Sequence, residues 1–279
     1  MLNTRNAFDL PLKDLFWRGT FEEFCACYCA YANNVVLDRN GPDPPLTSKL
    51  FQPNSGNFDE IYKFVGPSLM PRNDAPAFPY EALDKDRPHI YISLGTIFNE
   101  QPEFYRLCFA AFAQSRYQVV LSVGDKTPIS SLGAIPENFI VRNFVPQLDI
   151  LQYTALFVSH GGMNSANEAL YYGVPLIIIP QSIDQPWVAR RVAQLKAGKM
   201  LRRDRMQTST LRHAADEILA NSAYAQASTQ IGETLRQAGG YLRAADEIQS
   251  FMQKVSYYAA KEPVTLGAAL MERFVRWTS

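Results

Sequence analysis

One short segment, SHGGMNSANEAL at residues 159–170, places a histidine, two glycines and several polar side chains in a row. Gly161 and Gly162 have no Cβ, so a ligand can come close to the backbone at this point. A helix that starts just after them directs its free N–H groups and the positive end of its dipole toward that ligand, which favours a phosphate. His160 can donate a further hydrogen bond to a phosphate oxygen. The segment therefore predicts an anion site.

More polar residues follow the glycines at helical spacing. Asn164 and Ser165 can donate from the start of the helix, and Glu168 lies one turn farther, where a carboxylate can accept from the vicinal hydroxyls of a ribose. A structural alternative is open, because Ser165 and Glu168 also fit the S-x-x-E pattern of a capping box, which needs no ligand. A histidine after a strand, such as His160, is also often only a hydrogen-bonded structural residue.

A second polar pair, Asp184 and Gln185, opens the helical pattern DQPWVARRVAQL. As sugar ligands, Asp184 supplies two acceptors that can bridge adjacent hydroxyls, and Gln185 adds both a donor and an acceptor. The alternative is that Asp184 caps the helix by accepting from its first N–H groups. Together the pair favours a hexose.

These residues need a scaffold, and the chain from His89 onward predicts one. Five short runs rich in Val and Ile, in HIYISLG, YQVVLSVG, FIVRNF, ALFVSH and PLIIIPQ, alternate with helical patterns. Helices are expected at residues 103–113, 164–172, 208–221, 223–237 and 241–255, with a break at Gly239-Gly240. This alternation indicates an α/β fold with a parallel sheet and helices on both faces. Such sheets bind ligands beyond the carboxyl ends of their strands, which is where the polar residues stand.

Length and composition narrow the classes of protein. The chain has 279 residues, 47% of them hydrophobic, enough for one or two globular cores. Lys plus Arg and Asp plus Glu each total 27, so no overall field collects nucleic acid or acidic membrane. The apolar stretch at 174–180 is too short to span a bilayer, and the opening MLNTRNAFDLPLKD does not resemble a signal peptide. We expect a cytoplasmic protein without a transmembrane segment.

Known metal and cofactor motifs are incomplete or absent in this sequence. Cys25, Cys27 and Cys29 have no nearby fourth ligand for zinc. The D-x-D string at residues 84–86 precedes the first strand, whereas a Mg²⁺ ligand pair should follow one. The P-loop, G-x-G-x-x-G and G-x-S-x-G motifs do not occur. We therefore expect no metal and no bound cofactor.

The segment at 159–170, followed by YGVP at 172–175 and PQSIDQ at 180–185, closely resembles the signature of family 1 glycosyltransferases. This family includes bacterial macrolide and flavonoid glucosyltransferases. The similarity extends upstream to FVPQ at 144–147 and SLGT at 93–96.

The resemblance covers about residues 46–252 and implies the Rossmann-like C-terminal half of a GT-B architecture with an incomplete N-terminal segment. Residues 1–86 would be a remnant of the acceptor domain and the linker. Residues 87–253 would be the donor-binding domain, and residues 254–279 a tail.

Carried over residue by residue, the resemblance implies a donor site at the strand ends. Residues of the glycine turn and the helix start would hold the diphosphate, and Glu168 the ribose. Asp184 and Gln185 would hold hydroxyls of the transferred sugar. Phe144 stands where plant members place a tryptophan against the uracil, and Gln147 would bind nearby. The implied donor-binding residues are Ser93, Thr96, Ser122, Val123, Phe144, Gln147, His160, Gly162, Asn164, Ser165, Glu168, Asp184 and Gln185.

Four of these assignments have an equally good structural alternative. Ser93 and Thr96 would reach the phosphates, while Ser122 and Val123 would line the base pocket, partly through their backbone. Small residues after strands also simply make turns.

The general base of the family is missing from this sequence. In the family, a histidine near the start of the first domain, oriented by an aspartate, takes the proton of the acceptor hydroxyl. The histidines here are His89, His160 and His213, so none lies in the first eighty residues. No catalytic residue is identified. Either the chain is a piece of a longer transferase, or a partner chain supplies the acceptor site.

The resemblance implies transfer of a hexose, with glucose as the first candidate, from a UDP-sugar to a hydroxyl of a small acceptor such as a macrolide or a phenolic. The transfer would invert the anomeric configuration, and the UDP-sugar would be a co-substrate. Two alternatives stay open: a non-catalytic nucleotide-sugar-binding subunit, and a sugar-nucleotide epimerase.

Overall fold

A six-stranded parallel sheet forms the centre of the computed structural model, which describes residues 47–58, 63–70, 76–181, 184–247 and 249–250. The strand order is β3-β2-β1-β4-β5-β6. The strands are β1 (His89–Ser93), β2 (Gln118–Ser122), β3 (Phe139–Arg142), β4 (Thr154–Ser159), β5 (Leu176–Ile178) and β6 (Gly198–Met200). From β1 the chain adds β2 and β3 toward one edge of the sheet, and from β4 it adds β5 and β6 toward the other edge. The order in which strands are added therefore reverses between β1 and β4, although all strands are parallel.

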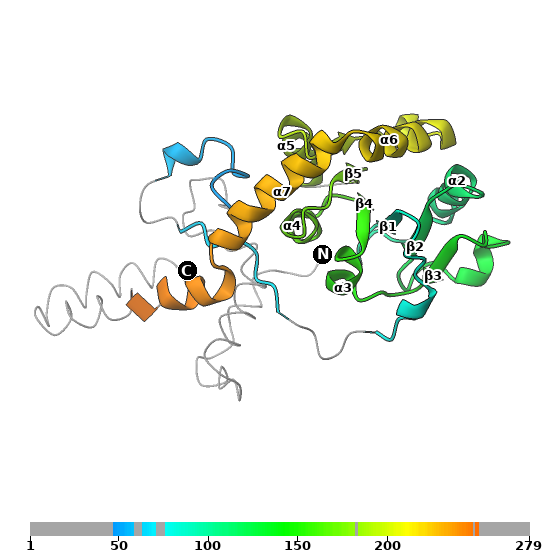
Figure 1. Cartoon of the computed structure of the whole chain (residues 1–279), viewed down its shortest axis with the longest axis horizontal. Coiled ribbons are helices and arrows are strands. Elements are labelled where there is room, and N and C mark those ends of the chain that lie inside the picture. Colours follow the sequence, from blue (N-terminus) through cyan, green and yellow to red (C-terminus); the bar gives the residue numbers. More distant parts are fainter. Residues whose placement is uncertain (1–46, 59–62, 71–75, 182–183, 248, 251–279) are drawn as a thin grey trace, which may run out of the picture.

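Helices connect the strands and cover the sheet (Figure 1). They are α2 (Pro102–Phe112), α3 (Gln147–Leu151), α4 (Met163–Tyr171), α5 (Gln185–Gln194), α6 (Thr208–Ala220) and α7 (Ser222–Gln237). Single 3-10 turns lie at η4 (Ser55–Asn57), η5 (Tyr80–Ala82), η6 (Ile129–Leu132) and η7 (Arg203–Arg205). The predicted α/β class with a parallel sheet is confirmed.

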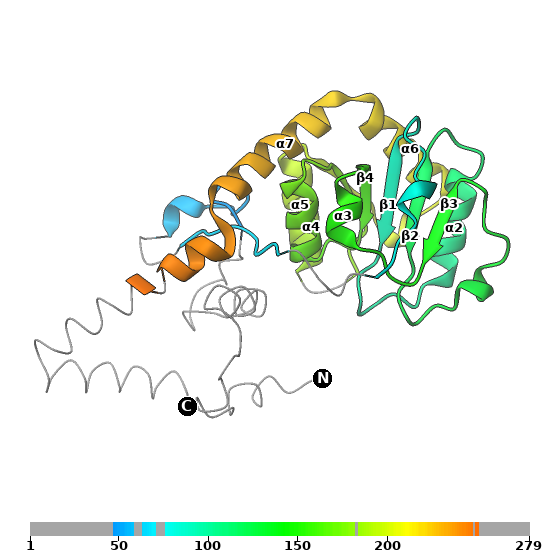
Figure 2. The same ribbon diagram turned by 60° about the horizontal axis from the view of Figure 1, so that its bottom comes forward.

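Side chains of the sheet alternate between two cores, because successive residues of a strand point to opposite faces. In β1, Ile90 and Ile92 belong to the core that includes residues of α2 and α6. Tyr91 belongs to the other core, with residues of α3, α4, α5 and α7. Helices thus lie on both faces of the sheet (Figure 2), and every residue of β1 is buried.

A segment that precedes the sheet by several tens of residues is part of the second core. The Phe51 ring is fully buried and meets Trp187 of α5 edge to face, with 6.2 Å between ring centroids. Arg191 Nε donates to the Phe51 carbonyl at 2.7 Å, and the Thr47 hydroxyl donates to Asn167 Oδ1 of α4 at 3.0 Å. Residues 47–53, which the sequence places with the linker, therefore pack on the helices of the donor-side domain.

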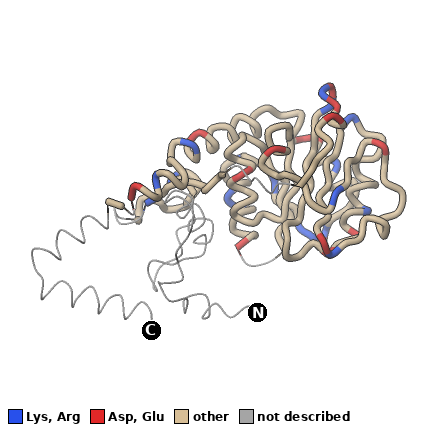
Figure 3. The backbone as a smooth tube through the Cα atoms, turned by 90° about the horizontal axis from the view of Figure 1, so that it is seen from below, with Lys and Arg blue, Asp and Glu red and all other residues tan. Residues whose placement is uncertain are grey.

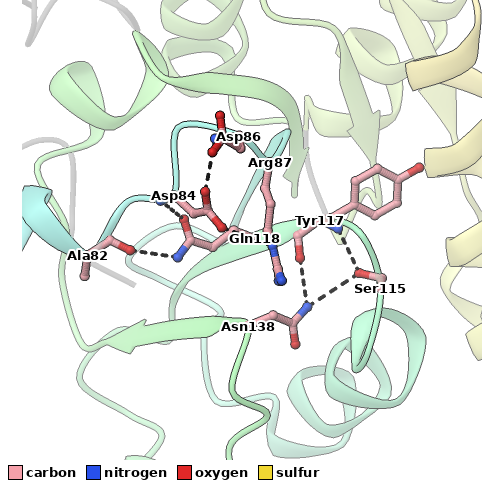
Figure 4. Close-up of polar contacts among 8 residues, drawn as sticks. All are labelled: Ala82, Asp84, Asp86, Arg87, Ser115, Tyr117, Gln118 and Asn138. Atoms are coloured by element: carbon pink, nitrogen blue, oxygen red, sulfur yellow. Dashed lines mark hydrogen bonds and ion pairs between the residues drawn. The ribbon is translucent and has the colours of Figure 1, made fainter.

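The segment just before β1 is hydrogen-bonded to the end of the sheet at which the strands begin (Figure 4). Gln118 Oε1 accepts from the Asp84 N–H and its Nε2 donates to the Ala82 carbonyl, both at 2.8 Å. The Asp84 carboxylate accepts from the Asp86 N–H at 3.0 Å and pairs with Arg87 at 3.1 Å. The D-x-D string thus forms a local turn at the edge away from the carboxyl ends of the strands.

The glycine break after α7 is confirmed. Gly239 and Gly240 have φ angles of +96° and +62°, in the region that favours glycine. The Gly240 N–H donates to the Val65 carbonyl at 2.6 Å, and residues 240–247 continue as a helix. The turn therefore ties the segment at residues 63–67 to the C-terminal helices.

Lys and Arg positions and Asp and Glu positions are interspersed along the described backbone (Figure 3), in line with the equal totals of 27. Across the described residues, each helix is too short or too polar to cross a membrane. The three clustered cysteines and the tail at 254–279 lie outside the described residues.

Candidate functional site

The predicted site residues gather where the strand order reverses. Ser93 ends β1 and Ser159 ends β4, and the two are register partners in neighbouring strands. The loop after β1 leads to α2 and the loop after β4 leads to α4, on opposite faces of the sheet. Diverging loops at such a point leave a crevice beyond the strand ends, which is the usual ligand site of these sheets.

The His160 ring lies between Gly95, in the loop after β1, and Gly162, in the loop after β4. A Cβ at Gly95 would lie 2.7 Å from His160 Cε1, and a Cβ at Gly162 would lie 2.6 Å from His160 Nε2. Real Cβ atoms do not approach other atoms so closely, so a side chain at either position would displace the imidazole. Gly161, with φ +85°, makes the turn itself. The glycines of the motif therefore position the histidine as well as opening the backbone.

The His160 imidazole is held in its neutral form. Burial lowers the pKa of His160, and the Asp184 carboxylate and the Ser93 backbone offset only part of this effect. Its Nδ1 is buried and has no hydrogen-bond partner among the described residues. A neutral imidazole carries one N–H donor and one acceptor nitrogen. The Ser93 backbone is a hydrogen-bond partner of this ring, so the single N–H would have to leave the Ser93 carbonyl in order to donate to a phosphate oxygen.

The depressed pKa has a consequence for stability. Because the unfolded chain binds a proton at position 160 more readily than the folded chain, stability should fall as the pH drops below the unfolded pKa of about 6.5. We expect His160→Gln, which cannot titrate, to lose less stability than the wild type between pH 8 and pH 5. Thermal unfolding of both proteins at several pH values measures this difference. Parallel pH curves would contradict the assigned burial of the neutral ring.

The helix start after the glycines is not explained by a capping box. Helix α4 begins at Met163 with Gly162 at its N-cap, a residue without a side chain that could cap the helix. Ser165 lies inside the helix, where its Oγ accepts from Gln147 Nε2 at 3.4 Å. The Ser165 and Glu168 pair therefore does not form the capping box that the sequence left open, and Asn164 lies exposed in the first turn.

Glu168 lies in a partly buried polar cluster between α3 and α4. The residue is 8% exposed, and its carboxylate accepts from Gln147 Nε2 at 2.5 Å. Gln147 Oε1 in turn accepts from the Tyr91 hydroxyl at 3.1 Å. The structure thus brings three of the predicted residues, Gln147, Ser165 and Glu168, into one network. Tyr91 was missed, since a tyrosine in an apolar strand looks like core, and the only signal was a hydroxyl two residues before the strand end.

The structure places the two residues of the second polar pair, Asp184 and Gln185, in different environments. Asp184 is exposed at the N-cap of α5, and its side chain makes no capping hydrogen bond, so capping does not account for it. Gln185 is buried, and its Oε1 accepts from the Gln181 N–H at 2.7 Å. Gln185 therefore holds the backbone of the turn, while Asp184 faces outward. Their binding of sugar hydroxyls stays a prediction.

The residues at the end of β2 make their hydrogen bonds inside the protein. The Ser122 hydroxyl donates to the Asn143 carbonyl at 3.0 Å. The Val123 side chain is fully buried, its N–H donates to the Arg142 carbonyl at 3.0 Å, and its carbonyl accepts from Tyr105 at 3.2 Å. The Val123 side chain therefore has no surface that could contact a base.

The other predicted residues differ in how far they are open. Ser93 is buried, and its Oγ accepts from the Gly95 N–H at 3.3 Å, which shapes the turn after β1. Thr96 is exposed in the same loop. Phe144, after β3, leaves 47% of its surface open to solvent, so one apolar ring is available for stacking.

Known proteins match both the sequence and this fold. A family model described as the C-terminal domain of proteins like erythromycin biosynthesis protein CIII matches residues 107–238. The uncharacterized UDP-glucosyltransferase YojK of Bacillus subtilis is 44% identical over 203 residues, which are 73% of this chain and 50% of that protein. The NDP-glycosyltransferase YjiC of the same species is 42% identical over 207 residues, 74% of this chain and 52% of that protein.

A solved structure shows the same likeness in three dimensions. The crystal structure of CalG4, the calicheamicin glycosyltransferase, matches with a TM-score of 0.68 at 33% identity. The match covers 75% of this chain and 53% of that one. The chain thus spans about half the length of the curated relatives it matches.

Proposed function

Because the chain belongs to the family 1 glycosyltransferases, whose C-terminal domain it contains, we propose that its site binds the donor, a UDP-hexose. One observation carries this proposal. His160, the start of α4 behind the glycine turn and the buried Glu168 lie together at the reversal point of the sheet. The first two suit a diphosphate and the third suits a ribose.

The chemistry of this half is stabilisation of the leaving group. When the bond between the sugar and the diphosphate breaks, negative charge grows on the diphosphate. Donors fixed in advance lower the energy of that state, by a few kcal/mol for a well-placed one. His160, held between Gly95 and Gly162, is such a donor. Asp184, exposed beside it, would accept hydroxyls of the transferred hexose.

The acceptor half lies outside this site. His89 begins β1 at the amino edge, and His213 is exposed on α6, so neither is near the strand ends that hold His160. We propose that another domain or chain supplies the general base and the acceptor pocket, for a macrolide or a phenolic hydroxyl. The transfer would then be a single displacement with inversion, and glucose is the favoured hexose because the relative YojK is called a UDP-glucosyltransferase.

Calorimetry with the chain alone tests the donor site. We expect UDP and UDP-glucose to bind, and uridine to bind more weakly because it lacks the diphosphate that His160 and α4 would contact. Equal affinity for uridine and UDP would contradict the assignment of a diphosphate site. Incubation with UDP-glucose and a phenolic acceptor then separates two roles: turnover indicates a complete transferase, and binding without turnover indicates a donor-binding half.

A further inference from the structure

A partly buried hydrogen-bond chain runs from the sheet into the site. It begins at Tyr91 in the middle of β1, passes through Gln147 at the start of α3 and ends on Glu168 and Ser165 of α4. We propose that Tyr91 is a positioning residue for the ribose subsite, which orients the Gln147 amide and through it the Glu168 carboxylate. This inference rests on the proposed function.

Tyr91 is a rigid starting point. Its ring is 2% exposed and stacks on Phe157 of β4, with 4.6 Å between centroids and 11° between planes. Burial also raises the pKa of the Tyr91 hydroxyl, so this group keeps its proton and acts as a donor. The direction of the hydroxyl is set by two neighbouring strands, which are the most constrained part of the fold.

The Gln147 amide has one orientation that satisfies its neighbours. Its Oε1 accepts from the Tyr91 hydroxyl at 3.1 Å, and its Nε2 donates to Glu168 Oε2 at 2.5 Å and to Ser165 Oγ at 3.4 Å. Turning the amide over would bring Oε1 against the Glu168 carboxylate, where two acceptors repel. The Tyr91 donor at one end and the Glu168 acceptor at the other therefore specify the amide together.

This matters for binding because a carboxylate must be oriented before it can accept from two adjacent hydroxyls. Glu168 is 8% exposed, so misalignment in this cluster is not readily relieved by water. Without the Tyr91 hydroxyl, Gln147 Oε1 would lose its donor and the amide would hold Glu168 less well. The affinity that is lost should be the part that depends on the ribose hydroxyls.

The test is a thermodynamic cycle read by calorimetry with UDP. Tyr91→Phe keeps the ring that stacks on Phe157 and removes only the hydroxyl. We expect this variant to bind UDP about 3- to 10-fold more weakly, the usual size for one buried hydrogen bond. In a Gln147→Ala background, the same substitution should change UDP affinity less than about 2-fold, because Tyr91 then has no amide to orient toward Glu168.

Two controls separate positioning from general stability. Tyr117→Phe removes the hydroxyl of another buried tyrosine, which donates to Asp216 at 2.5 Å and packs in the other core, so UDP affinity should not change. The second control is 2′,3′-dideoxy-UDP, which wild type and Tyr91→Phe should bind alike. The ratio of its affinity to that of UDP does not depend on the fraction of folded protein.

The outcomes are distinct. If the wild type does not bind UDP, the proposed function fails and this inference falls with it. If UDP binds and Tyr91→Phe binds it equally well, the inference alone is overturned. A loss that persists in the Gln147→Ala background, or that appears equally with the dideoxy ligand, would assign Tyr91 a purely structural role and would also overturn it.

Discussion

Replacing His160 with alanine is expected to weaken UDP binding about 10- to 100-fold, the usual effect of losing a hydrogen bond to a charged group. The ring is fixed between Gly95 and Gly162, so in the proposed site it would donate to the diphosphate without first having to be ordered. Calorimetry with UDP measures the loss. Unchanged affinity would show that the glycine turn serves only the fold.

The matched control for this substitution is His213→Ala. His213 leaves 84% of its side chain exposed on α6, and that helix supplies none of the predicted site residues. Its removal should leave UDP affinity as it is. Comparison of His160→Ala and wild type with uridine adds a second check, since a ligand without phosphates should not sense the change.

Phe51→Ala is expected to destabilise the protein by about 3–5 kcal/mol, the usual cost of emptying a buried phenylalanine site. The ring is fully buried against Trp187, although it comes from a segment ahead of the sheet. Urea unfolding measures the loss of free energy. A loss of less than about 1 kcal/mol would contradict the packing of residues 47–53 on the second core.

Leu50→Ala is the control at the adjacent position. Leu50 is 42% exposed, so its truncation should change stability by no more than about 0.5 kcal/mol.

Much of the sheet could be predicted because its signal is local. Five strands are apolar runs whose side chains are buried in one or the other of the two cores. The composition of each run can be read from the sequence without knowing which strands lie beside it. The edge strand β6, Gly198–Met200, has three residues and no apolar run, so its sequence does not distinguish it from a loop. Helix α3, Gln147–Leu151, has five residues and shows too little periodicity to be recognised.

The contacts that complete the site are long-range and were not accessible from spacing. Gln147 meets Glu168 across 21 positions and Tyr91 across 56, and nothing in their local patterns links them. Gln185 differs from Gln147 in that its observed partner is local. An amide at this position suits a sugar ligand, and the structure shows that its Oε1 accepts from the Gln181 N–H four residues away. Which way a polar side chain turns depends on a partner that spacing does not reveal.

The close contacts of the His160 ring also limit which residues can stand at position 162. At Gly162 the backbone φ is −59°, which any residue can adopt, and the atoms nearest to a Cβ there all belong to the His160 ring. The glycine at 162 is thus required by its neighbour and not by the turn. Alanine at 162 would force the His160 ring to move, whereas a protein that already carries His160→Ala has no ring there to displace. The effects of substitutions at these two positions should therefore not add.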